Sequence, residues 1–307
     1  MNLRIAPRNP IPPATRRWVR IVPMVAVVMG MFVVTSLVLG QRRFRGRWPE
    51  SRTTGQERTA REIESHSTGT PTWTNAPGFT QDVFTFARVV YEQGGWGGHG
   101  GWSTDTPDSD LNFSYRLQQM TSIKVDPDGR LIRLTDPDLS QYPFIYIVEP
   151  GGLFFSDSEV AALRAYLLNG GFLMLDDFWG DLEWANCEEK MKQVFPDRSF
   201  QELPLDHPLY HCVFEIQSKG QVPNVYQGVE SQYTGQTWES NHEGDTRTVH
   251  HRGITDDKGR LMVLATHNTD NGDGWEREGE DGYFFQQFSE KISYPLGINI
   301  VFYVMTH

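Results

Sequence analysis

Cysteine is scarce in this sequence, and several signatures of catalytic and metal sites are missing. Only Cys187 and Cys212 occur among 307 residues, and no Cys-x-x-Cys pair is present. The two thiols either form a disulfide outside the cytoplasm or remain free and buried, and the sequence leaves both alternatives open. The His-Glu-x-x-His and Gly-x-Ser-x-Gly motifs are also absent, so the sequence indicates neither a zinc-protease helix nor a nucleophile elbow.

Basic residues are scarce beyond the N-terminal fifth of the chain. Residues 1–61 contain 12 Arg against two acidic residues, whereas residues 62–307 contain 16 Lys and Arg against 37 Asp and Glu. The net charge of the whole chain is −11. Sequence-independent binding to nucleic acid needs a basic face, so the acidic part of the chain argues against nucleic acid as a partner. The basic arm over residues 1–20 is better explained by its position next to a membrane-spanning segment.

Long hydrophobic runs are rare, with one clear exception. Ile21–Gly40 contains 20 residues without a charge, which is long enough for a helix that crosses a bilayer. The alternative is a cleaved signal peptide, because Arg16 and Arg17 lie in a basic segment before the run. No Ala-x-Ala-like cleavage site follows, and the run is longer than the core of a usual signal peptide. We therefore predict a retained transmembrane helix over residues 21–40, which makes the membrane the first expected partner.

The arginines beside the run bear on the orientation of this anchor. Five arginines precede the run and four follow it directly, so the positive-inside rule is nearly balanced. We favour a short cytoplasmic N-terminus and an exported domain.

The central part of the sequence predicts a β-strand, an α-helix and a second β-strand. Phe144–Val148 and Phe172–Leu175 are continuous apolar runs, as expected of parallel strands that are covered on both faces. Between them, Ser156 and Glu159 form a capping box, and Gly170–Gly171 ends the helix. This unit favours an α/β fold with a doubly wound, mostly parallel sheet, whose sites lie at the carboxyl ends of the strands.

Further elements follow from apolar runs and helical spacing. Strands are expected at Val83–Tyr91, Leu131–Leu134 and Leu261–Ala265, and helices at Leu111–Ile123, Glu183–Val194 and Ser289–Met305. Residues 41–79 are polar with little periodicity, which predicts a flexible linker before a domain over residues 80–307. The polar residues 217–252 predict an irregular insertion or lid, in which His250 and His251 are expected to be solvated.

Three polar clusters each follow a predicted strand. They are the loop Gly94–Trp102 with Asp105, Asp108 and Asp110; Asp176–Asp181 with Glu149; and His267–Asp273. Because the carboxyl ends of parallel strands meet at one edge of a sheet, we expect these clusters to form a ligand site. The ligand-binding candidates are Trp96, Trp102, Asp105, Asp108, Glu149, Asp176, Trp179, Asn268 and Asp270.

The loop Gly94–Trp102 contains six glycines in nine residues, which lets a backbone approach a ligand closely. It lacks the lysine of a phosphate-binding loop, and the aspartates nearby would repel a phosphate. The alternative is a mobile loop in which Trp96 and Trp102 are packing anchors.

A divalent metal ion is the one cofactor that the sequence suggests. Asp105, Asp108 and Asp177 are the candidate ligands, because carboxylate oxygens suit Ca²⁺ and Mg²⁺. The spacing is not that of an EF-hand loop. Asp108 and Asp110 also lie where a helix begins, and capping of that helix is the better single explanation for Asp110.

The adjacent carboxylates Asp176 and Asp177 predict a division of roles. Side chains alternate along a strand, so we expect one carboxylate to accept loop amides and the other to face the cleft. Asp177, His267 and His207 are the catalytic candidates of a hydrolase. Each histidine is equally explained as a hydrogen-bonded residue of the core.

Two motifs carry a resemblance to a known family. Gly101–Asn112 is Gly-Trp-Ser-Thr-Asp-Thr-Pro-Asp-Ser-Asp-Leu-Asn, and Leu163–Phe178 carries the helix, the double glycine and the Asp-Asp-Phe ending. With the turn His207-Pro208, these segments resemble the bacterial family called domain of unknown function 4159, over residues 80–307. The resemblance implies a flavodoxin-like fold of the class I glutamine amidotransferase group, in membrane-associated or exported proteins. The expected location is therefore a bacterial inner membrane, with the domain on the periplasmic side.

The resemblance also bears on activity. Glutamine amidotransferases carry a cysteine nucleophile at a strand end, where this sequence has Asp176-Asp177, so amidotransfer is not expected. Related trehalose-utilisation-like domains suggest a carbohydrate ligand, on which Trp96, Trp102 and Trp179 would stack.

The interpretation favoured by the sequence is a membrane-anchored module of the cell envelope that binds a small molecule or a partner protein. The first alternative is a metal-assisted or acid–base hydrolase that uses Asp177 and His267. The second is a structural scaffold whose acidic surface meets a basic protein in a membrane complex. The sequence leaves the ligand, the metal and the oligomeric state open.

Overall fold

A mostly parallel β-sheet organises the described part of the chain. The computed structural model describes residues 53–79, 82–94 and 101–307. The sheet has seven strands in the order β3-β1-β4-β6-β9-β8-β7. The first five are parallel, β8 is antiparallel to β9, and β7 is antiparallel to β8. Strands β2 and β5 form a separate antiparallel pair. The strands are β1 Ala87–Val89, β2 Glu92–Gln93, β3 Arg130–Ile132, β4 Phe144–Val148, β5 Leu153–Phe154, β6 Phe172–Asp176, β7 Gln201–Glu202, β8 His250–Thr255 and β9 Leu261–His267.

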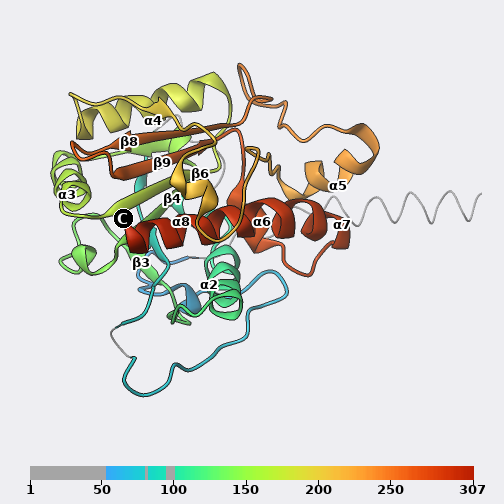
Figure 1. Ribbon diagram of the computed structural model, residues 1–307, viewed down its shortest axis with the longest axis horizontal. Helices are drawn as coiled ribbons and strands as arrows, with labels where there is room; N and C mark the ends of the chain where they lie inside the picture. The colour runs from blue at the N-terminus through green and yellow to red at the C-terminus, as the bar shows by residue number, and fades with distance from the viewer. Residues whose placement is uncertain (1–52, 80–81, 95–100) are drawn as a thin grey trace, which may run out of the picture. The chain divides into compact units, whose positions relative to one another are not determined.

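Helices cover both faces of this sheet, as Figure 1 shows. Residues of α3 and α4 pack on one face, and residues of α2, α6 and α8 pack on the other. The α-helices are α2 Asp108–Met120, α3 Asp157–Leu168, α4 Gly180–Val194, α5 Val225–Thr234, α6 Asn271–Glu276, α7 Gly282–Phe284 and α8 Tyr294–Thr306. A π-helix, Phe285–Ser293, runs directly into α8, and short 3-10 helices lie at Ala60–Glu62, Gly101–Ser103, Leu139–Gln141, Pro150–Gly152 and Pro208–His211.

The strand–helix–strand unit predicted from the apolar runs is confirmed. Phe144–Val148 is β4 and pairs in parallel with β6. Within β4, Ile145 and Ile147 face one core, whereas Phe144, Tyr146 and Val148 face the other. Burial on both faces is the reason why these strands read as continuous apolar runs. The helix between them begins with the predicted capping box and ends before two glycines, the first with φ 108°.

Other predicted elements differ from the structure mainly at their ends. The first strand is shorter than expected, at Ala87–Val89, and the first helix is Asp108–Met120. The residue at the N-cap of that helix is Pro107. The prediction that Asp110 caps the helix is wrong, because its carboxylate accepts hydrogen bonds from the buried Arg88.

Two segments that the sequence assigns to irregular chain carry ordered structure. Within the predicted linker, Ala60 and Ile63 are buried, and the Trp73 indole donates to the Val125 carbonyl at 2.9 Å. Within the polar residues 217–252 lie α5 and the start of β8. The prediction that His251 is solvated is wrong, since it is 1 % exposed and its ring stacks on Tyr210.

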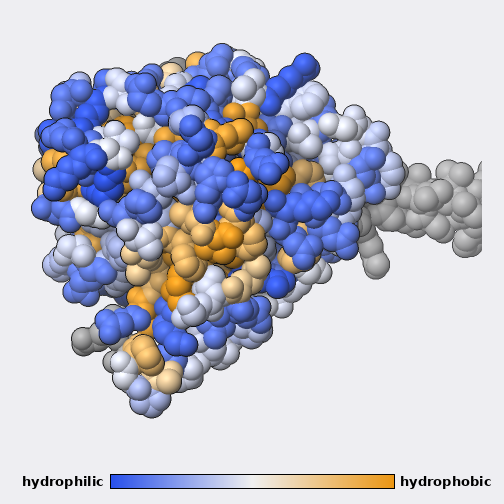
Figure 2. All heavy atoms as spheres, viewed as in Figure 1, coloured by the Kyte–Doolittle hydropathy of each residue, from blue (hydrophilic) through white to orange (hydrophobic). Residues whose placement is uncertain are grey.

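The predicted anchor and its basic arm, residues 1–40, lie outside the described residues, as does Trp96. Within residues 53–79, 82–94 and 101–307, no helix combines the length and the apolar character that a membrane crossing requires. Figure 2 shows a largely polar face on which apolar side chains gather over α8. Phe302 and Val304 of that helix are partly exposed, and Met305 is 51 % exposed.

A buried ion pair fixes the chain between β1 and α2. Arg88 of β1 is fully buried, and its Nε lies 2.9 Å from Asp110 Oδ2 in the first turn of α2. Its Nη1 donates to the carbonyls of Trp102 and Thr104, at 3.1 and 2.8 Å. One guanidinium therefore holds both ends of the segment that carries Asp105.

Removing the partner of this guanidinium should destabilise the fold strongly. Asp110→Ala leaves the charge of Arg88 buried without a counter-charge, so the free energy of unfolding should fall by about 3–5 kcal/mol. Asp257→Ala is the matched control. That carboxylate pairs with Arg198 at 2.7 Å but is 89 % exposed, so its loss should cost at most about 1 kcal/mol. Denaturant titration of both variants checks this prediction, and equal losses would contradict it.

Candidate functional site

A carboxylate-rich pocket lies at the carboxyl ends of the parallel strands. Its volume is about 240 Å³. It is lined by Thr104, Asp105, Glu149, Gly151, Gly152, Asp177, Trp179, Glu183, Asn224, Glu239, Asn241, His242, Asp270 and Asp273. Seven of these residues carry a carboxylate, and the only basic side chain among them is His242. The pocket is therefore strongly negative unless protons or cations neutralise it.

Four neighbouring strands each deliver one acidic residue to this pocket. Glu149, Asp177 and Asp270 come after the ends of β4, β6 and β9, and Asp105 lies in the longer connection from β1 to α2, after β2 and the 3-10 helix Gly101–Ser103. The strands β1, β4, β6 and β9 are consecutive in the sheet. Parallel strands end at the same edge, so residues far apart in the sequence meet there.

Three of these acidic residues have a backbone conformation that non-glycine residues rarely adopt. The φ angles are 61° for Asp105, 49° for Glu149 and 56° for Asp177. Asn268, directly after β9, has a φ of 63°. Such left-handed residues cost on the order of 1–3 kcal/mol each and gather at functional sites. The strain therefore marks the pocket as a site that the fold maintains at a cost in stability.

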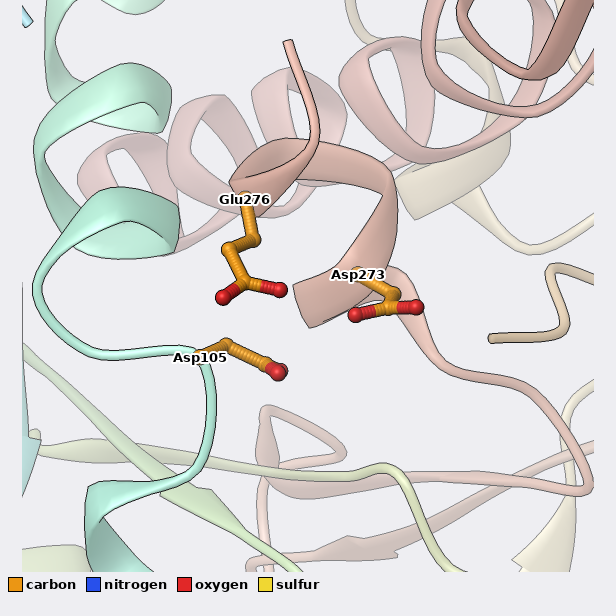
Figure 3. Close-up of side chains that lie close together, drawn as sticks. All are labelled: Asp105, Asp273 and Glu276. Atoms are coloured by element: carbon orange, nitrogen blue, oxygen red, sulfur yellow. The ribbon is translucent and has the colours of Figure 1, made fainter. Parts of the chain in front are cut away.

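Two groups of carboxylates converge around Asp105. Single carboxylate oxygens of Asp105, Asp177 and Asp270 all lie within 4.8 Å of one another. The same holds for Asp105, Asp273 and Glu276, whose side chains point toward one another in Figure 3. In the second group, Arg277 Nε lies 2.6 Å from a Glu276 oxygen. In the first group, no ion pair to a Lys, Arg or His side chain is found within the described residues.

Burial and mutual repulsion raise the pKa values of the first group. Burial, followed by the charge of Asp273, raises the pKa of Asp105 well above its ordinary value. Burial, followed by the charge of Glu149, does the same for Asp177. For Asp270 the causes are burial and the charge of Asp177. Without a cation, these carboxylates gain free energy by binding protons.

Two further residues of the pocket lining, Glu149 and His242, have raised pKa values. Burial raises the pKa of Glu149 to about 7, against a hydrogen bond from the Gly101 amide. Burial lowers the pKa of His242, but its contacts with Glu183 and Glu239 outweigh this and raise it to about 9. The His242 ring lies 2.9 Å from Glu183 and 3.6 Å from Glu239. His242 is therefore cationic at neutral pH and is already paired.

The structure brings together five of the residues predicted from the sequence: Asp105, Glu149, Asp177, Trp179 and Asp270. The expected division between the adjacent aspartates is also observed. Asp177 lines the pocket, whereas Asp176 is fully buried and accepts from the Gly272 amide at 3.1 Å. Asp176 also accepts from Tyr146 and Asn271, at 3.0 and 2.8 Å. Asp176 therefore joins β6 to β4 and α6.

Three other candidates lie outside the pocket. Asp108 is buried and accepts hydrogen bonds from Ser65 and from the His66 amide. Trp102 packs against the core, and its carbonyl accepts from Arg88. Asn268 is fully buried, where its side chain accepts from Gly180 and donates to the carbonyls of Asp245 and Thr248. These side chains hold segments together instead of facing a ligand.

The two candidate histidines also lie away from the pocket lining. His267 is 3 % exposed, its Nε2 lies 2.9 Å from the Gly180 carbonyl, and burial lowers its pKa to about 4. His207 Nδ1 accepts from the Leu209 amide at 3.2 Å, and its ring packs on Tyr303. Both therefore fit the alternative of a hydrogen-bonded core histidine.

Several lining residues were not singled out from the sequence. Asn224, Glu239, Asn241 and His242 belong to the polar residues 217–252, where only the polarity of the segment gave a signal. This insertion reaches the pocket because the Asp181 amide donates to the Glu243 carbonyl at 2.8 Å. A Cβ on Gly180 would lie 2.2 Å from that carbonyl, so the close approach requires glycine.

The arrangement is suited to a hard divalent cation. Asp105 is 9 % exposed, and its Oδ2 accepts no hydrogen bond from the described residues. An ionised oxygen without a partner is costly inside a protein, so it points to a cation at this place. Asp105, Asp177 and Asp270 would then hold the ion, with water or ligand oxygens completing the six to eight positions that Ca²⁺ or Mg²⁺ takes.

The fold and the pocket define the class of this protein as an α/β domain with an acidic pocket at the carboxyl ends of its parallel strands. The chain belongs to the family described as Domain of unknown function (DUF4159), whose model matches residues 85–305. The match spans most of the chain and includes every residue of the pocket. The predicted family is therefore confirmed. A comparison with curated proteins finds no match.

The titration of Glu149 predicts a loss of stability as the pH rises. A carboxyl whose folded-state pKa is raised binds more protons in the folded than in the unfolded state, so stability falls through this window as protons leave. For Glu149 the window runs from 4.5 to about 7. In EDTA, the free energy of unfolding of the full chain, and with it the Tm, should fall across this window, and Glu149→Gln should remove up to about 3 kcal/mol of the fall in free energy.

Glu290→Gln is the control, because Glu290 is exposed on the π-helix and away from the pocket. Parallel Tm-against-pH curves for the wild type and Glu149→Gln would contradict the prediction.

Proposed function

We propose that the described domain is a binding module whose pocket takes a divalent cation together with a small polar ligand. The observation that carries the proposal is the convergence of Asp105, Asp177 and Asp270 without an ion-pair partner in the described part of the chain. A single cation would relieve the repulsion that otherwise keeps these carboxyls protonated. It would also leave coordination positions open toward the pocket.

The rest of the pocket suggests the chemistry of the ligand. Anions are disfavoured by the carboxylates, so a neutral ligand with several oxygen atoms fits best. Asn241 also lines the pocket and offers an amide donor and an amide acceptor. The Trp179 indole donates to Asp177 Oδ1 at 3.1 Å and adds an apolar wall. A carbohydrate or another polyol would match these features.

Cation binding should be visible as thermal stabilisation. The full chain, purified in detergent and stripped with EDTA, should gain about 5–10 °C in Tm when Ca²⁺, Mg²⁺ or Mn²⁺ is present at roughly 100 times its Kd. Asp177→Asn should abolish this gain. The same variant should raise the Tm of the metal-free protein near neutral pH, because it removes a half-buried carboxyl whose ionised form is repelled by its neighbours.

Asp257→Asn is the matched control, since Asp257 is exposed and distant from the pocket lining. It should keep the full cation-dependent gain. A wild type whose Tm does not respond to any of the three cations would overturn the proposed function.

We also infer that the fold is of the flavodoxin type and lacks amidotransferase activity. Numbered along the chain, the five parallel strands have the order 2-1-3-4-5, which is the flavodoxin order. Cys187 is buried in α4, where burial raises the pKa of its thiol, and Cys212 follows a 3-10 helix. Both are free thiols, and neither follows a strand of the sheet. Asp177 occupies the strand-to-helix turn after β6.

We further propose that residues 21–40 anchor this domain to a bacterial inner membrane, with the domain exported. The uncharged run of 20 residues supports the anchor. The full chain should sediment with membranes, and a chain that begins after residue 40 should not. Protease added to spheroplasts should degrade the domain while the membrane is intact. Protection of the domain would reverse the proposed orientation.

A hydrolase is the second candidate, and the pKa of Glu149 favours it. A carboxyl with a pKa of about 7 in a pocket suits general acid–base catalysis. In this candidate Glu149 has the acid–base role that the sequence analysis gave to His267. Turnover of p-nitrophenyl esters, phosphates or glycosides that is lost in Glu149→Gln would favour this candidate over binding alone. A scaffold that meets a basic partner would show neither turnover nor a cation-dependent Tm.

A further inference from the structure

Asp105 belongs to both groups of converging carboxylates. One group adds Asp177 and Asp270, and the other adds Asp273 and Glu276. A carboxylate has two oxygens with about four lone-pair sites, so one aspartate can serve two cations at once. Asp105 lies in the loop before α2, and Figure 3 shows its side chain beside those of Asp273 and Glu276.

The position of Asp105 depends on a glycine that separates the two groups in the sequence. Gly272 lies between Asp270 and Asp273, and a Cβ built on it would lie 2.2 Å from Asp105 Oδ2. The unpaired oxygen therefore occupies the space that any other side chain would fill. It is buried and accepts no hydrogen bond from the described residues. One carboxylate oxygen of Asp105 lies within 4.8 Å of oxygens of Asp177 and Asp270, and one lies within 4.8 Å of oxygens of Asp273 and Glu276.

The charges of the combined groups exceed what one divalent cation can neutralise. The five carboxylates carry five negative charges when ionised. The guanidinium of Arg277 lies 2.6 Å from Glu276 and 3.6 Å from Asp273, and because it also pairs with Glu280 it offsets at most one of these charges. At least four negative charges therefore remain when all five carboxyls are ionised, and one divalent cation cancels only two of them.

The second group already has protein contacts. Glu276 Oε1 contacts the His66 ring, and Asp273 Oδ2 accepts from the Val225 amide at 2.6 Å. Each carboxylate retains lone pairs after these contacts, so both side chains can still coordinate a cation. The contacts fix the two side chains in the orientation that faces Asp105, which lowers the ordering cost of binding.

We propose that the pocket is a two-cation centre in which Asp105 bridges a first ion held by Asp177 and Asp270 and a second ion held by Asp273 and Glu276. The proposal rests on the proposed function, because it adds a second ion to the same pocket. The ions are of the hard, oxygen-preferring class. Two ions that share a carboxylate would bind a ligand through an oxygen atom placed between them.

Stoichiometry with Mn²⁺ tests the proposal. The full chain in detergent, stripped with EDTA, should bind two Mn²⁺ ions per chain in equilibrium dialysis with metal analysis. Electron paramagnetic resonance should show a spin-coupled pair at saturation. Glu276→Gln and Asp177→Asn should each retain one ion and lose the coupled signal, and Asp105→Asn should lose the coupled signal and weaken both sites.

Glu280→Gln is the matched control, because Glu280 pairs with Arg277 but belongs to neither group. It should keep two coupled ions. If the wild type binds one ion, or binds two ions that Glu276→Gln does not affect, the two-cation centre is overturned and the proposed function stands. If the wild type binds no ion, the two-cation centre and the proposed function are both overturned. If a variant fails to fold, the number of Mn²⁺ ions bound by the wild type and their spin coupling still test the proposal.

Discussion

The mutual repulsion of carboxylates at one edge of the sheet is the constraint on which the rest of this structure depends. Asp105, Asp177 and Asp270 come from three segments far apart in the chain and converge in one pocket, where Asp105 and Asp270 are buried and Asp177 is half-buried. Ionised groups so placed must bind protons or cations, because the interior cannot screen them as water does. A sheet edge arranged in this way stores an electrostatic cost that a bound cation releases.

Several devices keep these carboxylates in place against that repulsion. Arg88 holds the segment that carries Asp105 through hydrogen bonds to the Asp110 carboxylate and to the carbonyls of Trp102 and Thr104. Asp176 fixes the turn after β6 by accepting from α6 and from β4. The left-handed conformation at Asp105 and Asp177 then adds its own strain. Such over-determination is typical of sites whose geometry is maintained for a ligand.

The sequence predicted much of the fold and part of the site, for physical reasons that particular elements show. Phe144–Val148 and Phe172–Asp176 are buried on both faces, so their apolar runs reveal them without tertiary knowledge. The capping box at Ser156 is a local motif and was equally readable. Because both strands are parallel, the acidic residues after them could be placed at one edge, which brought Glu149 and Asp177 into the predicted site.

The sequence by itself determined the strand–helix–strand unit, the family and the acidic character of the site, because periodicity, capping and charge are local properties. Only the tertiary structure decided which polar residues face the pocket. Asp108 and Asp110 differ little from Asp105 in sequence context, yet one bonds Ser65 and the other Arg88. The contribution of His242 and the convergence of Asp273 with Asp105 depend on contacts between segments far apart in the chain, and no local pattern encodes such contacts.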